Sequence, residues 1–177
     1  MSDFKVNDTV VEPTIGICKI EGIVQKTVDE KTELYYVFEA ETNRTKVYIP
    51  KSQIKKRGVR KPMTKEAIRK IINMLKVPVT PQRTDLRTQY LTYRDIMKSG
   101  DPVQICKLLR DLYILEQSDD LKGKEKEIMD QASKFLIEEI VFVKGDSKTK
   151  VTEHLQEALK AMYKKKQIKD KEKKAAK

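Results

Sequence analysis

The sequence predicts an α+β protein of two domains, a small antiparallel β domain followed by a compact all-α bundle of about five helices. Two changes along the chain indicate this. Up to about Ile54, branched apolar and polar residues alternate with a period of two, which is typical of half-buried strands. From Met63 onward, apolar residues recur every three or four positions, which is typical of amphipathic helices. A chain of 177 residues, 38% of them hydrophobic, can fill two modest cores.

The β part reads as about five short strands in a strongly bent sheet or half-barrel. "FKV" and "TVV" are separated by the turn pair Asn7-Asp8. The long stretch "ICKIEGIVQKTV" alternates, and Gly16 and Gly22 mark places where a bend or bulge would relieve curvature. "ELYYVFEA" and "TKVYIP" flank the polar loop "ETNR", which predicts a hairpin. Pro50 ends the last strand.

Start and stop signals divide the helical part. Thr64 is the expected N-cap of the first helix, and Val77-Pro78 ends it, because the residue before proline avoids the helical region. The second helix starts at Thr84 or Asp85. The third helix has the strongest start, with Asp101 as N-cap, Pro102 at N1 and Gln104 at N3. Gly100 and Gly145 are the expected C-terminal stops of the second and fourth helices.

Each predicted helix carries an apolar stripe that is expected to face the bundle core. The five stripes are Ile68, Ile71, Ile72 and Leu75; Leu86, Tyr90, Tyr93 and Met97; Ile105, Leu108, Leu109 and Leu112; Ile128, Ala132, Phe135, Leu136 and Ile140; and Val151, Leu155, Ala158, Leu159 and Met162.

Charge divides the chain into three segments. Residues 1–60 form the β domain and carry 11 Lys and Arg against 9 Asp and Glu. Residues 61–163 form the helical domain and carry 19 against 16, and the linker between the two domains is expected near "KKRGVRKP", residues 55–62. Residues 164–177 carry 8 against 2, over half of the net charge of +11. This lysine-rich tail is expected to be disordered and to attract polyanions without sequence preference.

Several function classes find no support in the sequence. No run of 18 apolar residues is present, and the first residues lack the features of a signal peptide, so the cytoplasm is the expected location. Cys18 and Cys106 are expected to be reduced, packed thiols. The single histidine, His154, is expected at the surface of a helix. No phosphate-binding glycine loop or metal-ligand spacing occurs, so neither an enzyme nor a cofactor is expected.

Six segments in a fixed order carry a family resemblance. They are "FKVNDTVVEPTIGICKIEGI", "VYIP", "MLKVP", "KSGDP", "LLRDLY" and "LKGKEKEIMDQA". Over roughly residues 3–160, the chain resembles the bacterial CarD/CdnL family of RNA polymerase-binding transcription factors. The resemblance implies a Tudor-like N-terminal domain, also similar to the polymerase-binding module of the transcription-repair coupling factor. In the family this domain pairs with the polymerase β subunit strand against strand, as an exposed sheet edge permits.

The resemblance points to Lys26 and Tyr48 as polymerase-binding residues. Both fall where the family places charged contacts with the polymerase. Lys26 keeps the charge, whereas Tyr48 would contribute an aromatic face instead. The alternatives are a lysine at a loop edge for Lys26 and an ordinary core or sheet-surface residue for Tyr48.

The family's helical domain contacts promoter DNA at the upstream edge of the transcription bubble, where a tryptophan wedges into the minor groove. This chain contains no tryptophan, and Leu86 occupies the corresponding position. An apolar leucine can serve as a wedge between base steps, although it covers less area than an indole. The alternative is an ordinary core residue at the start of a helix.

The resemblance implies that basic residues of the helical domain bind the phosphates of the DNA backbone. The family places basic residues just after its tryptophan, where this chain has Thr88, Gln89 and Leu91. Lys126 matches a DNA-facing position of the family. The alternative interpretation of Lys126 is an ordinary solvent-exposed lysine at the start of a helix. The other candidate contacts are Arg83, Arg87, Arg94, Lys122 and Lys124.

The resulting interpretation is a non-enzymatic transcription regulator, a monomer in the cytoplasm associated with the bacterial nucleoid. It would bind the RNA polymerase β subunit and promoter DNA, and would change the stability of the open complex. No membrane and no cofactor are implied. The alternative is a stand-alone, largely sequence-nonspecific DNA-binding protein that does not depend on polymerase.

Overall fold

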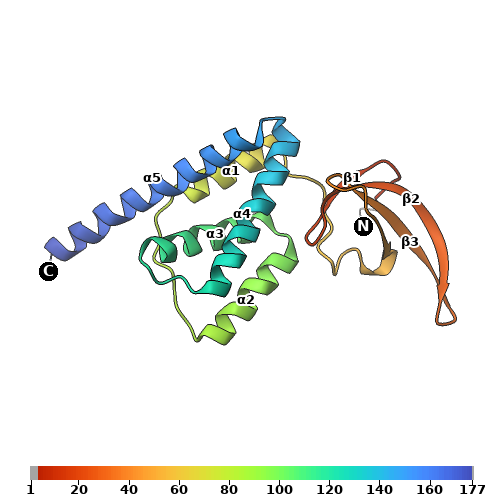
Figure 1. Ribbon diagram of the computed structural model, residues 1–177, viewed down its shortest axis with the longest axis horizontal. Helices are drawn as coiled ribbons and strands as arrows, with labels where there is room; N and C mark the ends of the chain where they lie inside the picture. The colour runs from red at the N-terminus through yellow and green to blue at the C-terminus, as the bar shows by residue number, and fades with distance from the viewer. Residues whose placement is uncertain (1–3, 177) are drawn as a thin grey trace. The chain divides into compact units, whose positions relative to one another are not determined.

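The computed structural model describes residues 4–176, which form two compact units (Figure 1). The first unit is the β part, up to Pro62, together with the short segment Lys98–Gly100. The second unit is helical and contains the remainder of the chain. The fold class predicted from the sequence, a small bent antiparallel sheet followed by an all-α bundle of five helices, is confirmed.

The β unit is one antiparallel sheet of four strands in the order β1-β2-β3-β4. The strands are β1 (Thr9–Glu12), β2 (Gly16–Val28), β3 (Lys31–Ala40) and β4 (Lys46–Pro50), and a short 3-10 helix, Lys51–Gln53, follows them. Figure 1 shows β2 and β3 as a long curved hairpin. The pairing register shifts between Ile20 and Gly22, so the predicted bulge is present and helps the sheet to bend.

The prediction of five strands was wrong by one, because residues 4–6 are not in a strand. Asn7 has a φ of 74°, a left-handed conformation that asparagine tolerates better than most residues. The Asp8 carboxylate accepts a hydrogen bond from the backbone N–H of Lys5 at 2.8 Å. This local turn takes the place of a first strand, while Phe4 remains buried in the core.

One face of the sheet forms the core of the β unit. Alternate residues of β2, β3 and β4 point to this face, as the pairing register requires. Its buried residues are Phe4, Val10, Cys18, Ile20, Tyr36, Phe38, Ala40, Ile49 and Ile54. The opposite face of the same strands includes exposed residues, among them Lys26 and Tyr48.

The segment predicted as a linker is not a free connection, because its first residues are bound to the sheet. Arg60 and Val11 exchange two backbone hydrogen bonds, of 2.8 and 3.1 Å. The Arg57 guanidinium donates from Nε and Nη2 to Glu12 Oε1, at 3.1 and 2.9 Å. Glu12 Oε2 accepts further bonds from the backbone N–H groups of Thr14 and Ile15. Since Glu12 is only 1% exposed, this carboxylate ties the end of the β unit to the first strand.

Replacing Glu12 by alanine is therefore expected to destabilise the β unit strongly. The change leaves the Arg57 guanidinium, which is 37% exposed, and two backbone N–H groups without their acceptor, and the loss of hydrogen bonds to a charged group costs about 1.5–3 kcal/mol. The free energy of opening can be measured by hydrogen exchange at the β2 and β3 amides. Glu41→Ala, at an exposed position, is the control, and a change of about 0.5 kcal/mol is expected there. Equal protection in the two variants would show that the Glu12 contacts do not hold the unit together.

The helical unit contains α1 (Lys65–Leu75), α2 (Leu86–Ser99), α3 (Pro102–Gln117), α4 (Gly123–Lys144) and α5 (Lys148–Ala175). The predicted N-caps are present, because Thr64 accepts from the Ala67 N–H and Asp101 from the Val103 N–H. Gly145 ends α4 with a left-handed φ of 69°. None of the helices in the described residues combines the length and the hydropathy needed to cross a bilayer.

Four of the five predicted stripes are buried as expected, those of α1, α3, α4 and α5. The stripe of α2 was predicted incorrectly. Its buried residues are Gln89 and Tyr93, whereas Leu86 is exposed and Tyr90 and Met97 are half-buried. The physical reason is that polar contacts, in place of apolar packing, occupy the buried side of α2. The Gln89 side chain donates to the Tyr93 hydroxyl and to the Gln82 carbonyl, and it accepts from Arg83.

The lysine-rich tail is helical in the structure, where a disordered segment was predicted. Helix α5 continues from its packed stripe to Ala175 without a break. Its last turns contain no glycine or proline and are rich in Lys, Gln, Glu and Ala, all of which favour helix. An ion pair between Lys166 and Asp170, spaced i, i+4, adds local support.

Candidate functional site

Lys26 and Tyr48, the two residues predicted to bind the polymerase, meet on the surface of the sheet. The Lys26 ammonium lies 3.4 Å from the centre of the Tyr48 ring, a cation–π contact between β2 and β4. Tyr48 is 45% exposed and Lys26 is also exposed, so neither is a core residue. A core position for Tyr48 is excluded, whereas the alternative of an ordinary sheet-surface tyrosine agrees with its exposure. Lys26 lies within β2, two residues before the strand ends at Val28.

The pairing register surrounds this contact with apolar side chains. Val24 lies opposite Tyr35, and Val37 lies opposite Tyr48, so all of them share the face that carries Lys26. Val24 and Tyr35 are half-buried, and Val37 is buried. We call these five residues the Lys26–Tyr48 patch. The patch combines one exposed cation with an aromatic and aliphatic base, which suits contact with another protein.

β4 forms an edge of the sheet beside this patch. In the described residues β4 pairs only with β3, so one side of Lys46–Pro50 faces no other strand. An edge strand presents unpaired N–H and C=O groups that a strand of another chain can bind. The patch and the edge therefore offer side-chain and main-chain contacts at adjacent positions.

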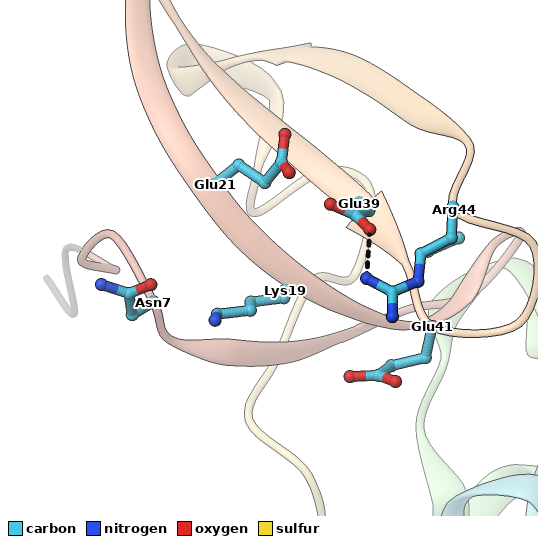
Figure 2. Close-up of a pocket in the computed structure, with 7 residues that line it drawn as sticks. Asn7, Lys19, Glu21, Glu39, Glu41 and Arg44 are labelled. Carbon is cyan, nitrogen blue, oxygen red and sulfur yellow. Dashed lines mark hydrogen bonds and ion pairs between the residues drawn. The ribbon is translucent and has the colours of Figure 1, made fainter.

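A hollow on the β unit is lined by charged residues, of which Glu39 and Arg44 pair with each other (Figure 2). Its volume is about 540 Å³, and its lining includes Lys19, Glu21, Glu39 and Arg44. Arg44 is bound to Glu39 at 2.9 Å, and Lys46 is bound to Glu21 at 2.7 Å. Two of the charged residues that line the hollow, Glu21 and Glu39, are therefore engaged in ion pairs within the sheet.

In the helical unit, Leu86 is the first residue of α2 and is 59% exposed. The core alternative for Leu86 is therefore wrong. Asp85 caps the helix, since its carboxylate accepts from the Thr88 N–H at 2.9 Å. Hydrogen bonds from the Thr88 side chain and from its backbone hold the pKa of Asp85 below its usual range. A capped first turn keeps the backbone beneath Leu86 in a fixed position.

Arg83 positions the start of α2 and is engaged within the protein. Its guanidinium donates to Glu125 at 2.7 Å and to Asp120 at 3.2 Å. Partial burial lowers the pKa of Arg83, but Glu125 and Asp120 outweigh this and raise it above its ordinary value. The buried Glu125 also accepts from the Lys122 N–H and so caps α4. This ion pair joins the beginnings of α2 and α4.

The lysines at the start of α4 lie beside α2. The Lys124 ammonium is 5.5 Å from the centre of the Tyr90 ring, which is one turn after Leu86 on α2. Lys122 lies 3.8 Å from Asp120. Lys126 binds Glu116 at 2.6 Å, which raises the pKa of Lys126. The charge of Lys126 is thus partly neutralised by Glu116. The Lys124 ammonium lies near an aromatic ring, which leaves its charge free to bind an anion.

The remaining predicted contacts lie on the exposed side of α2. Arg87 and Arg94 are exposed and are two turns apart on one face of the helix. Thr88 and Leu91 are exposed beside them, but Gln89 is buried and cannot meet a ligand. The structure therefore groups Leu86, Arg87, Arg94, Tyr90 and Lys124, and we call this group the α2 surface.

The two cysteines are buried thiols and the histidine is a surface residue, as the sequence predicted. Cys18 and Cys106 are buried and unpaired, and burial raises the pKa of each thiol to about 12. Both thiols therefore remain protonated at neutral pH, whereas a reactive cysteine must be a deprotonated thiolate. His154 is exposed on α5, as predicted. Within the described residues no cluster of His, Cys, Asp or Glu could hold a metal ion.

Comparison with known proteins covers both units. Residues 4–63 match the model of the CarD-like/TRCF RID domain, and residues 70–156 match the model of the CarD C-terminal domain. The chain belongs to the CarD family. A curated relative, the putative transcription factor YdeB of Bacillus subtilis, is 28% identical over 142 residues, which cover 80% of this chain and 93% of YdeB.

A solved structure of a CarD protein is also similar to part of this chain. It is the 72-residue N-terminal domain of Myxococcus xanthus CarD, determined in solution by NMR. The two sequences are 29% identical, the match covers 33% of this chain and 79% of the CarD domain, and the TM-score is 0.30. As a member of the CarD family, the chain is a transcription regulator with the two-module order that the sequence predicted.

The sequence did not reveal the contact of Tyr90 with Lys124 or the roles of the buried carboxylates Glu125 and Glu12. Tyr90 was assigned to a buried stripe because an aromatic residue at helical spacing usually is buried. Glu125 stands three residues after Lys122, and a Glu at N3 is a capping signal that could have identified it. Glu12 carries no local signal, since its partner Arg57 is 45 residues away.

Proposed function

We propose that this protein binds the RNA polymerase β subunit through the Lys26–Tyr48 patch and the adjacent edge of β4. The β unit would add its β4 edge to a strand of the polymerase, and the patch would hold a side chain from the same surface. The observation that supports this proposal is that Lys26 and Tyr48 are both exposed and in direct contact at 3.4 Å. The match to the CarD-like/TRCF RID domain supports the same partner.

The helical unit would contact promoter DNA through the α2 surface. Leu86 would act as the apolar wedge at the upstream edge of the bubble, on the capped first turn of α2. Arg87, Arg94 and Lys124 would bind phosphates, which fix position without reading sequence. Arg83 would act as a positioning residue, because its charge is already bound by Glu125 and Asp120.

Acting as a monomer, the protein would alter transcription by changing the populations of closed and open promoter complexes. A ligand shifts such an equilibrium by the difference between its affinities for the two states. The wedge fits only where base steps are already opened, so binding would favour the open complex. Because polymerase would set the position on DNA, sequence-specific base contacts would not be needed.

Removal of residues 1–60 is expected to abolish co-purification of RNA polymerase while binding to free DNA persists. The reason is that the two units have separate cores, and only the β unit carries the Lys26–Tyr48 patch. The measurement is capture of the β subunit by the full chain and by the shortened chain, together with retention of a labelled duplex. Wild-type capture of polymerase by the shortened chain would contradict the proposal.

A second candidate function is stand-alone DNA binding that does not depend on polymerase. The observation in its favour is the concentration of positive charge in residues 164–177, with 8 lysines against 2 acids. The same pair of measurements separates the two candidates. A full chain that retains DNA but captures no polymerase would support the stand-alone function.

A further inference from the structure

The last turns of α5 extend beyond the packed part of the helical unit (Figure 1). Met162 is the last buried residue of the helix, and nearly every residue from Lys164 to Ala176 is exposed. This segment also lies beyond residue 156, where the match to the CarD C-terminal domain ends. We call Lys164–Ala175 the α5 extension. Neither the bundle core nor the family match accounts for it.

Six exposed lysines of the α5 extension fall on two sides of the helix. With about 3.6 residues per turn, each residue is rotated by about 100° from the previous one. Lys165, Lys169 and Lys173 are spaced i, i+4, i+8 and form one stripe. Lys164, Lys171 and Lys174 form a second stripe, centred roughly 170° away from the first. The two acids, Asp170 and Glu172, lie between the stripes.

Two opposed stripes of cations match a partner that has negative charge on both sides of the helix. The major groove of duplex DNA is such a partner, since it is bounded by two phosphate backbones. It is about 12 Å wide, and an α-helix with side chains is about 10–12 Å across. A helix lying along the groove would present one stripe to each backbone.

A membrane surface fits the α5 extension less well. A helix that lies on a bilayer needs an apolar face opposite its charged face. Here the only large apolar residue is Ile168, which is 57% exposed, and both broad sides of the helix carry lysines. A flat anionic surface would also engage one stripe and leave the other in solvent.

We propose that the α5 extension is a second nucleic-acid contact, a helical arm that binds the groove of duplex DNA without reading its sequence. This goes beyond the polymerase-dependent function and deepens the second candidate function, on which it rests, because it specifies how the same lysines would bind DNA without polymerase or the α2 surface. Its affinity comes from release of counterions by lysines on both stripes. The arm would add binding strength along DNA while other contacts determine position.

The test replaces each stripe by glutamine, which removes three charges and keeps helix propensity. One variant is Lys165→Gln, Lys169→Gln, Lys173→Gln, and the other is Lys164→Gln, Lys171→Gln, Lys174→Gln. The affinity of the full chain for a free duplex is measured over a range of salt concentrations. Each variant is expected to reduce the slope of log affinity against log salt by up to about 2.7, since each phosphate contact contributes about 0.9. The two reductions are expected to add in the sixfold variant.

The control removes the same number of charges elsewhere on the helical unit. Lys65, Lys107 and Lys148 are exposed and lie outside both the α2 surface and the α5 extension. Their joint replacement by glutamine is expected to change the slope by much less than either stripe variant does. Circular dichroism checks that helix content is retained.

Three outcomes would overturn the inference. An effect of only one stripe would show a one-sided contact, and equal effects of the stripe and control variants would show a response to net charge alone. Tighter binding to vesicles that contain anionic lipid than to the duplex, lost in the same variants, would assign the arm to membranes. None of these measurements involves polymerase, so they remain informative if the proposed polymerase contact fails.

Discussion

Lys26→Glu is expected to abolish co-purification with RNA polymerase while the β unit remains folded. The substitution reverses the charge of the Lys26–Tyr48 patch and places a carboxylate next to the Tyr48 ring. Glu33 lies directly opposite in the strand register, so two like charges would face each other. Loss of one partner of a charge pair that is buried in an interface costs about 2–5 kcal/mol, so about 3 kcal/mol, roughly a hundredfold in affinity, is expected on loss of the Lys26 cation.

The measurement is the dissociation constant for purified polymerase, with thermal unfolding recorded in parallel. Lys56→Glu is the matched control, because Lys56 is an exposed lysine of the same unit outside the patch. Tyr48→Phe is expected to retain binding and Tyr48→Ala to lose it, since the phenyl ring keeps the aromatic face. If folded Lys26→Glu protein bound polymerase as tightly as the wild type does, another surface of the β unit would have to be the dock.

Leu86→Ala is expected to shorten the lifetime of open promoter complexes roughly tenfold, while stability changes by only about 0.5 kcal/mol. Leu86 is 59% exposed, so the protein loses little packing when the side chain is removed. The wedge, in contrast, loses the apolar burial of a whole leucine side chain against DNA, about 1.5 kcal/mol or more. The rate of decay of open complexes after addition of a competitor measures this loss.

Leu86→Trp is expected to lengthen the same lifetime, because an indole covers more of a base step than a leucine does. Val77→Ala is the control, since Val77 is an apolar residue of the same unit that is 52% exposed and lies outside the α2 surface. Unchanged decay in both Leu86 variants, or a loss of 2–5 kcal/mol of stability on Leu86→Ala, would remove the wedge from the proposed function.

Local signals explain why most of the helical unit could be predicted from the sequence. The caps at Thr64 and Asp101 and the stop at Gly145 depend on neighbours within a few residues, so they can be read along the chain. Four apolar stripes were predicted correctly for the same reason, because a regular helix brings residues three and four apart together. The bulge near Gly22 in β2 follows from a local pattern as well.

Contacts between distant residues explain what could not be predicted. Arg57 is 45 residues from Glu12, and Arg83 is 42 residues from Glu125, so no local pattern pairs them. The first pair binds the supposed linker to the sheet, and the second joins the beginnings of α2 and α4. The second contact belongs to the polar packing that leaves Leu86 exposed where periodicity indicated a buried stripe.

The sequence by itself determined the two-unit α+β architecture, the positions of most helices and the resemblance to the CarD family. It also indicated which positions to inspect, namely Lys26, Tyr48 and Leu86. Only the tertiary structure decided that Lys26 and Tyr48 touch, that Leu86 faces solvent and that α5 continues into the lysine-rich extension. The physical reason is that burial and cross-strand contact depend on which surfaces meet in three dimensions, and sequence periodicity specifies only which residues share a face.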